Sequence, residues 1–302
     1  MYKKNWWRLS FDVNNNFEDT LIWKLLDIGI SSYSFNYSEN NSFYGELVIW
    51  LPKSNWDKAK IKNLEEIFLK LFEENNYQFH SFRYELVNAN DWLNSWKKYW
   101  KPNKVGKNFL ILPSWLELPK KYEDRNIIKI DPGLAFGSGD HPSTSLCLEM
   151  MEAESMFSKK ILDIGCGSGI LSIAAKKLGA GNISSIDNDY LSINSTKENI
   201  VLNFNNQNDF IIYQGTFNEI INNFSLHKFD YVICNILAEI IKEIIPYIPQ
   251  LMNENGKVIL SGIISSQKDD IIKLLNLYNF KVDHVVSKKD WICIQACLTK
   301  SF

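Results

Sequence analysis

The chain has 302 residues, with 33 Lys and Arg against 35 Asp and Glu and a formal net charge of −2. Hydrophobic residues make up 45% of it and charged residues 23%, which is typical of a globular protein long enough for two domains. The near-neutral charge argues against a protein that coats nucleic acid by bulk electrostatics. No apolar run reaches the ~20 residues that a membrane helix needs.

The first residues lack the apolar segment of a signal peptide, so we do not expect export. The five cysteines are scattered and form no C-x-x-C pair, and no metal-ligand spacing is present. These features predict a cytoplasmic protein with reduced thiols and without a structural metal, DNA partner or membrane anchor. The sequence does not determine the oligomeric state, for which a monomer is the default expectation.

Residues 1–87 alternate between short strand and helix patterns. Strands are predicted at 6–11, 32–37, 43–51 and 77–87, and helices at 17–28 and 58–74. The order β-α-β-β-α-β predicts a small α+β ferredoxin-like domain. Because this part has no glycine loop, metal cluster or catalytic pairing, it is either a scaffold or, as we favour, a substrate-recognition domain.

Residues 88–115 are interpreted as a linker helix and a connecting segment. Trp92, Trp96 and Trp100 recur every four residues and therefore share one helix face, which favours packing over substrate contact. The lysines around Pro102 are typical of solvated surface, and an acidic partner or RNA is the alternative reading. One short strand is predicted at 109–112.

Residues 116–302 form the predicted catalytic domain, in which strands and helices alternate regularly from residue 160. Strands are predicted at 160–164, 182–187, 209–213, 229–234, 257–263, 280–286 and 291–297. Helices are predicted at 169–179, 190–203, 237–252 and 267–278. This pattern predicts an α/β fold with a doubly wound, largely parallel seven-strand sheet, whose last two strands pair antiparallel because their connection is short.

The most informative segment is 161–171, an apolar strand followed by glycines at 165, 167 and 169 and then an apolar helix. Glycine suits a sharp turn in which the backbone touches a ligand, and the helix that follows presents free N–H groups. A dinucleotide fingerprint needs a glycine where Ile170 stands. The G-x-G-x-G pattern is instead typical of S-adenosylmethionine-dependent methyltransferases, with a dehydrogenase as a distant alternative.

Asp187 ends the next predicted strand, 22 residues after Gly165. An acid at this place in a βαβ unit accepts hydrogen bonds from ribose hydroxyls. The alternative is a helix N-cap, a role that Asp189 would serve equally well. The strand-terminal acid therefore favours a nucleoside cofactor.

A second glycine-rich segment, 131–144, precedes the sheet and carries Phe136 as an apolar tip. Pro142 suits the first turn of a helix over 143–151, which places the Thr144 hydroxyl either facing the cofactor or as a simple helix cap. His141 has no companion ligands, so we interpret it as a structural histidine rather than a base or metal ligand.

Asn235 ends the predicted strand 229–234, beside the glycine loop. Its carboxamide oxygen could accept an N–H from an amine and so aim the nitrogen lone pair at a methyl group. Many amine methyltransferases have Asn-Pro-Pro-aromatic at this point, whereas this chain has Asn-Ile-Leu. The alternative is an ordinary asparagine in a turn.

Taken together, D-P-G-L-A-F-G at 131–137, H-P at 141–142, D-I-G-C-G-S-G-I-L at 163–171 and N-I-L at 235–237 resemble the methyltransferase family of large-ribosomal-subunit protein eleven. Further positions match its pattern: Trp92, Pro102, Gly106, P-S-W at 113–115 and L-S-G-I at 260–263. The resemblance covers roughly residues 88–298. Asp140 and Ser143 depart from it, since the family commonly has threonines there.

The resemblance implies S-adenosylmethionine as cofactor, a ribosomal protein of the large subunit as substrate, and methylation of lysine side chains and the N-terminal amine. The cofactor-binding positions that it implies are Thr144, Gly165, Asp187 and Asn235. To these we add Gly167 of the same loop and Phe136, whose loop we expect to close over the cofactor. We further expect Asn235 to be catalytic, by orienting the amine. Gly215 and Thr216 lack the acid often found near the adenine, so no adenine ligand is named.

The amine must be neutral to attack, and its ordinary pKa is about 10.4. The sulfonium of the cofactor lowers this pKa. A unit charge about 4 Å away at an effective dielectric of ~20 destabilises the ammonium by roughly 4 kcal/mol, which is about three pKa units. No dedicated base is then required. Two alternatives remain open: methylation of RNA or a small molecule, and a non-catalytic module that binds the cofactor on the ribosome.

Overall fold

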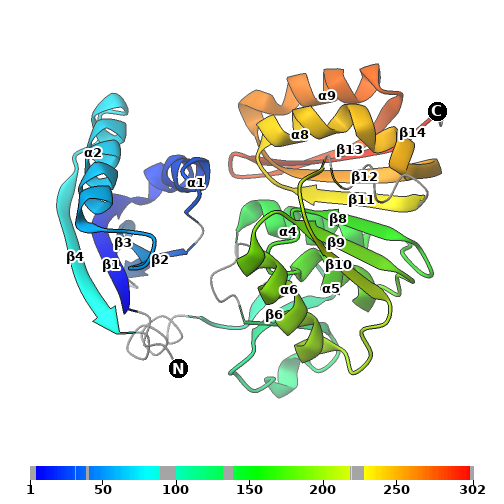
Figure 1. The fold of residues 1–302 in the computed structure, drawn as a ribbon, viewed down its shortest axis with the longest axis horizontal. Helices are drawn as coiled ribbons and strands as arrows, with labels where there is room; N and C mark the ends of the chain where they lie inside the picture. Colours follow the sequence, from blue (N-terminus) through cyan, green and yellow to red (C-terminus); the bar gives the residue numbers. More distant parts are fainter. Residues whose placement is uncertain are drawn as a thin grey trace. The chain divides into compact units, whose positions relative to one another are not determined.

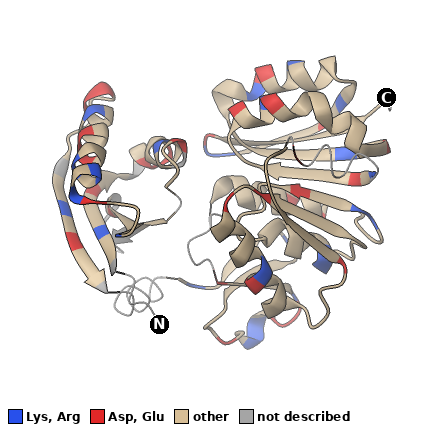
Figure 2. Ribbon diagram, viewed as in Figure 1, with Lys and Arg blue, Asp and Glu red and all other residues tan. Residues whose placement is uncertain are grey.

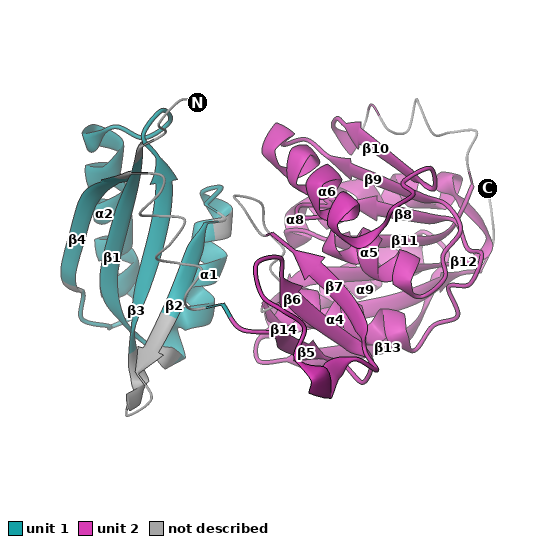
Figure 3. Cartoon of the chain, turned by 90° about the horizontal axis from the view of Figure 1, so that it is seen from below, with its two compact units in different colours: residues 1–100 teal, residues 101–302 magenta. Residues whose placement is uncertain are grey.

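The computed structural model describes residues 5–30, 32–38, 41–88, 100–131, 139, 141–217, 219 and 228–299. It divides into two compact units, residues 1–100 and 101–302 (Figure 3). Residues 101–115, which the sequence analysis assigns to a connecting segment, fall in the second unit. The predicted helix over 88–100 lies almost wholly outside the described residues. None of the described helices has the length and apolar character needed to cross a membrane.

The first unit is a four-stranded antiparallel sheet with two helices. Its elements are β1 (Asn5–Asn14), α1 (Glu18–Asp27), β2 (Tyr33–Ser38), β3 (Asn41–Pro52), α2 (Lys58–Glu74) and β4 (His80–Asn88). The strand order β2-β3-β1-β4 is that of a ferredoxin-like fold and confirms the predicted topology. Phe11 of β1 sits at the centre of the core, with its ring 5.0 Å from Phe68 and 5.8 Å from Phe72 of α2. Helix α2 carries both charges, with lysines in its first turns and mostly glutamates after them (Figure 2).

The second unit is built on the predicted seven-strand sheet. Its strands are β8 (Ile161–Ile164), β9 (Ile183–Asp187), β10 (Phe210–Gln214), β11 (Phe229–Asn235), β12 (Met252–Ile264), β13 (Phe280–Lys288) and β14 (Trp291–Leu298). The order is β10-β9-β8-β11-β12-β14-β13, and β14 is antiparallel to both neighbours. The prediction of a mostly parallel sheet with an antiparallel final pair is confirmed.

Helices cover both faces of this sheet (Figure 1). They are α4 (Pro142–Glu152), α5 (Ile170–Lys177), α6 (Tyr190–Asn203), α8 (Ala238–Ile244) and α9 (Lys268–Leu277). The first three form one group, in which α5 contacts both α4 and α6, whereas α8 and α9 contact each other. The predicted helix over 237–252 is wrong in its second half, which is 3-10 helix from Ile245 to Leu251. Pro246 and Pro249 lack the N–H groups that an α-helix needs there.

A second, three-stranded sheet precedes α4 and was only partly predicted. It pairs β6 (Phe109–Pro113) antiparallel with β5 (Asn103–Val105) and parallel with β7 (Asn126–Ile130). Glu152 at the end of α4 accepts hydrogen bonds from the N–H groups of Lys107, Asn108 and Phe109 at 2.7–3.0 Å. This carboxylate fastens the small sheet to the helix that leads into the main sheet.

Candidate active site

The glycine loop follows β8 and is a left-handed turn. Gly165, Gly167 and Gly169 have φ of +74°, +55° and +80°, a region that other residues rarely adopt. A Cβ on Gly165 would collide with the Ile236 side chain, so the loop also needs glycine for space. Gly169 is the N-cap of α5, and the helix begins at Ile170, slightly later than the sequence predicts.

Asp187 ends β9 directly beside this loop. Its Oδ2 accepts a hydrogen bond from the Gly167 N–H at 2.9 Å, and its Oδ1 accepts one from the Asp189 N–H at 2.9 Å. Burial raises the pKa of Asp187, against the lowering effect of these two bonds. The N-cap of α6 is Asp189, whose side chain accepts from the Leu191 N–H. Asp187 is therefore not the helix cap, and its role as a ribose ligand stays a prediction.

Asn235 ends β11, and its carboxamide points to α4. Its Nδ2 donates to the Oγ1 of Thr144 at 3.1 Å. The two side chains are 8% and 0% exposed. The Oδ1 of Asn235 is buried and has no hydrogen-bond partner among the described residues. A buried carbonyl oxygen without a donor costs free energy, so it marks a place where a ligand N–H would be accepted.

A glycine on β12 lets Asn235 reach this position. Gly262 has φ +82°, and a Cβ there would collide with the carbonyl oxygen of Ile236. The pairing of β12 with β14 is shifted between Leu260 and Ile263, at the same place. The L-S-G-I segment therefore makes room for the main chain that follows Asn235.

His141 is the N-cap of α4. Its Nδ1 accepts from the Ser143 N–H at 3.3 Å and lies 2.7 Å from the Ser143 hydroxyl, and its ring packs edge-on against Trp291 at 4.5 Å. Burial, with a smaller effect of Lys289, lowers the pKa of His141 to about 3. A neutral, packed imidazole fits the structural role that the sequence analysis gives it.

Asp163 lies under the glycine loop on β8 and is fully buried. Its Oδ2 accepts from the Ser172 hydroxyl at 2.6 Å, and Ser172 also lies 2.7 Å from the Ser185 hydroxyl. Burial raises the pKa of Asp163 to about 7, although the Ser172 hydrogen bond acts in the opposite direction. This carboxyl group therefore changes its charge near neutral pH.

Two site residues escaped the sequence analysis, Thr196 and Asn199 of α6. The Thr196 hydroxyl donates to the Gly167 carbonyl oxygen at 2.9 Å, and Asn199 donates to the Ser168 carbonyl oxygen at 2.9 Å. Their spacing of three residues on a predicted helix was the available signal, because it puts both polar groups on one face. Phe136 lies outside the described residues, so its role stays a prediction.

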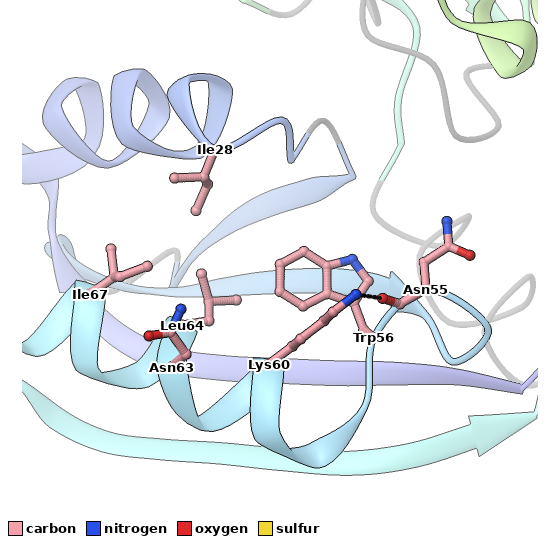
Figure 4. Close-up of a pocket in the computed structure, with 7 residues that line it drawn as sticks. All are labelled: Ile28, Asn55, Trp56, Lys60, Asn63, Leu64 and Ile67. Carbon is pink, nitrogen blue, oxygen red and sulfur yellow. Dashed lines mark hydrogen bonds between the residues drawn. The ribbon is translucent and has the colours of Figure 1, made fainter.

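The first unit has a pocket of about 390 Å³ between the end of α1 and α2 (Figure 4). It is lined by Ile28, Asn55, Trp56, Lys60, Asn63, Leu64 and Ile67. The Lys60 ammonium donates to the Asn55 carbonyl oxygen at 2.8 Å. None of these seven residues is an acid, thiol or imidazole.

A glycine loop after the first strand and an acid after the second, in a sheet of this order, define a class I S-adenosylmethionine-dependent methyltransferase. The model of the ribosomal protein L11 methyltransferase family (PrmA) matches residues 5–299. The chain belongs to this family. It is therefore a methyltransferase, and the resemblance read from its sequence is confirmed.

Named relatives agree with this assignment. A ribosomal protein L11 methyltransferase of Prochlorococcus marinus strain MIT 9515 is 51% identical over 291 residues, which is 96% of this chain and 97% of that protein. A more distant relative, from strain MIT 9313, is 34% identical over 95% of both chains. The crystal structure of a ribosomal protein L11 methylase from Lactobacillus delbrueckii subsp. bulgaricus has 32% identity and a TM-score of 0.60, covering 65% of this chain and 98% of that one.

Proposed function

We propose that the protein transfers methyl groups from S-adenosylmethionine to amino groups of large-ribosomal-subunit protein L11 in the cytoplasm. The acceptors are lysine side chains and the N-terminal amine. Family membership supports the substrate. The observation that carries the chemistry is the buried Oδ1 of Asn235, which has no donor among the residues that the structure describes and lies at the carboxyl end of β11.

The described residues fit S-adenosylmethionine. Asp187 offers a carboxylate for the sugar hydroxyls, and the loop beside it has glycine at positions 165, 167 and 169. Thr144 fixes Asn235, and Phe136 is proposed as a further contact. When bound, the cofactor supplies an electrophilic methyl group.

Asn235 is proposed to position the acceptor nitrogen. Its Nδ2 is used by Thr144, which leaves Oδ1 as the acceptor for an amine N–H. Only the neutral amine has a lone pair, and transfer into a buried site lowers the pKa of a lysine from about 10.4. The proton is lost to water, and the oxygen of Asn235 then holds the amine with its lone pair directed away. Catalysis rests on this positioning.

Recognition of the ribosomal protein is assigned to the first domain, residues 1–87, followed by the linker 88–115 and the catalytic domain 116–302. The pocket beside Trp56 supports this role, because its lining combines four apolar side chains with two asparagines and a lysine, a mixture that suits a protein segment. The protein is proposed to act as a monomer.

The test is transfer of labelled methyl groups to an extract from cells that lack this protein. Label on a single band identified as L11, located by mass spectrometry on lysines and the N-terminus, is the expected result. Label on ribosomal RNA, or no label on any protein while the cofactor is bound, would overturn the proposal. Purified L11 and purified ribosomes then distinguish free protein from assembled subunit as the substrate.

A further inference from the structure

Two asparagines of α6 hydrogen-bond to the free edge of β7. The carboxamide of Asn203 accepts from the N–H of Lys129 at 2.9 Å and donates to its carbonyl oxygen at 2.6 Å. Asn199, one turn earlier, accepts from the N–H of Asp131 at 2.8 Å and donates to its carbonyl oxygen at 3.2 Å. Each side chain thus replaces a neighbouring strand, since β6 pairs with the opposite edge of β7.

The two asparagines differ in where the carboxamide donates besides β7. Nδ2 of Asn203 also donates to the carbonyl oxygen of Asn199 at 2.8 Å, whereas Nδ2 of Asn199 also donates to the carbonyl oxygen of Ser168, in the glycine loop, at 2.9 Å. Three acceptors lie within reach of this Nδ2: the carbonyl oxygens of Ser168 and Asp131 and, farthest at 3.4 Å, the Ser195 hydroxyl. Because a carboxamide NH₂ has two hydrogens, the two shorter bonds, to Ser168 and Asp131, use both. Asn199 is fully buried, so water cannot replace these bonds.

The contact reaches both glycine-rich segments. Ser168 belongs to the loop after β8, and Asp131 begins the segment 131–144 that precedes α4. Thr196, on the same helix face, holds the neighbouring carbonyl oxygen of Gly167. Two side chains on one face of α6 therefore hydrogen-bond to two successive carbonyl groups of the glycine loop and hold the turn in place.

We infer that Asn199 is a positioning residue for the cofactor, because its buried carboxamide holds the glycine loop and Asp131 at a fixed separation. The inference rests on the proposed function, in which the glycine loop holds S-adenosylmethionine. A loop already held in its binding conformation loses less conformational entropy when the ligand binds. Asn199 touches no reacting atom, so its loss weakens cofactor binding and leaves the chemical step intact.

The test compares Asn199→Leu with Asn203→Leu, which removes the same kind of edge contact without touching the glycine loop. Calorimetric titration with S-adenosylmethionine should show a Kd about tenfold higher for Asn199→Leu, as expected for one lost buried hydrogen bond. The Kd of Asn203→Leu should stay within about twofold of the parent. At saturating cofactor, kcat of both variants should equal that of the parent. Thermal unfolding gives the loss of stability separately.

Asn199→Asp provides a second measurement on a side chain of the same shape. One oxygen of its carboxylate still accepts from the Asp131 N–H. The other replaces the NH₂ donor by an acceptor that faces the carbonyl oxygens of Ser168 and Asp131, so these two bonds are lost. Protonation restores one donor, so the ratio of its Kd to that of the parent should fall as pH is lowered, unlike the ratio for Asn203→Asp.

Equal Kd values for Asn199→Leu and Asn203→Leu, or a fall in kcat without a change in Kd, would overturn the inference. A parent protein that fails to bind S-adenosylmethionine would instead overturn the proposed function. The two failures are therefore distinguishable in one set of titrations.

Discussion

Replacing Asn235 with alanine should separate catalysis from cofactor binding. The substitution removes the buried acceptor Oδ1 and the hydrogen bond from Nδ2 to Thr144. Loss of one net hydrogen bond costs about 1 kcal/mol of folding stability, or roughly 2–4 °C in Tm for a domain of this size. Loss of a preorganised polar group at the reacting centre costs about 10²- to 10³-fold in kcat. The Kd for S-adenosylmethionine should change less than about threefold.

The assay measures initial rates of methyl transfer to purified L11 at saturating cofactor, with calorimetry for cofactor affinity. Thr144→Val and Thr144→Ser form the matched pair, because valine keeps the shape and serine keeps the hydroxyl that accepts from Asn235. Valine should lower kcat by about tenfold, the equivalent of one hydrogen bond that no longer fixes the carboxamide. Serine should restore most of the rate.

Equal losses of kcat and cofactor affinity in Asn235→Ala would refute this reasoning, since they would make Asn235 only a cofactor ligand. An unchanged kcat would refute it as well, because the orphaned oxygen would then have no part in holding the amine.

Three further predictions follow from described contacts. Asp187→Ala should raise the Kd for S-adenosylmethionine by about 10- to 100-fold, because it removes a charged acceptor. Asp189→Ala, which removes only the cap of α6, should lower the free energy of unfolding by about 1 kcal/mol and leave the Kd unchanged. Gly262→Ala should lower both Tm and activity, because its Cβ would collide with the main chain after β11. Gly29 has a similar positive φ but open space around it, so Gly29→Ala should lower the free energy of unfolding by about 1–2 kcal/mol and leave activity unchanged. Burial raises the pKa of Asp163 in the folded protein to about 7, from an ordinary value of 3.8. The stabilisation by this group is therefore complete below pH 3.8 and is lost as pH rises toward 7, by up to about 1.4 kcal/mol per pH unit. Denaturant titrations of the parent and Asp163→Asn from pH 4 to 8 should show that the substitution removes this loss. The same dependence of the free energy of unfolding on pH in both proteins would contradict the prediction.

The fold could be predicted from the sequence because the hydrophobic residues follow clear helical and strand periodicities. Helix α2 has the predicted bounds, and its apolar residues at 61, 64, 68 and 72 form the buried face. The α-helix predicted over 237–252 was too long, because apolar spacing continues through Pro246 and Pro249 into a 3-10 turn. Strands β5 and β7 were missed, since short, partly polar strands lack a clear alternation.

The site residues that directly follow a predicted strand could be found from the sequence. Gly165, Asp187 and Asn235 follow β-strands whose carboxyl ends meet in a parallel sheet, so a spacing argument finds them. Asn199 could not be found in that way. Its contacts join residues 31 and 68 positions away in the chain, which only the packing of α6 brings together.

The central claim is that the glycine loop and Asp187 bind S-adenosylmethionine. Calorimetric titration of the purified protein with this nucleoside, and separately with a nicotinamide dinucleotide, tests it most directly. We predict saturable one-site binding of S-adenosylmethionine that Asp187→Ala weakens, and no heat with the dinucleotide. Clean binding of the dinucleotide, with none of S-adenosylmethionine, would contradict the account.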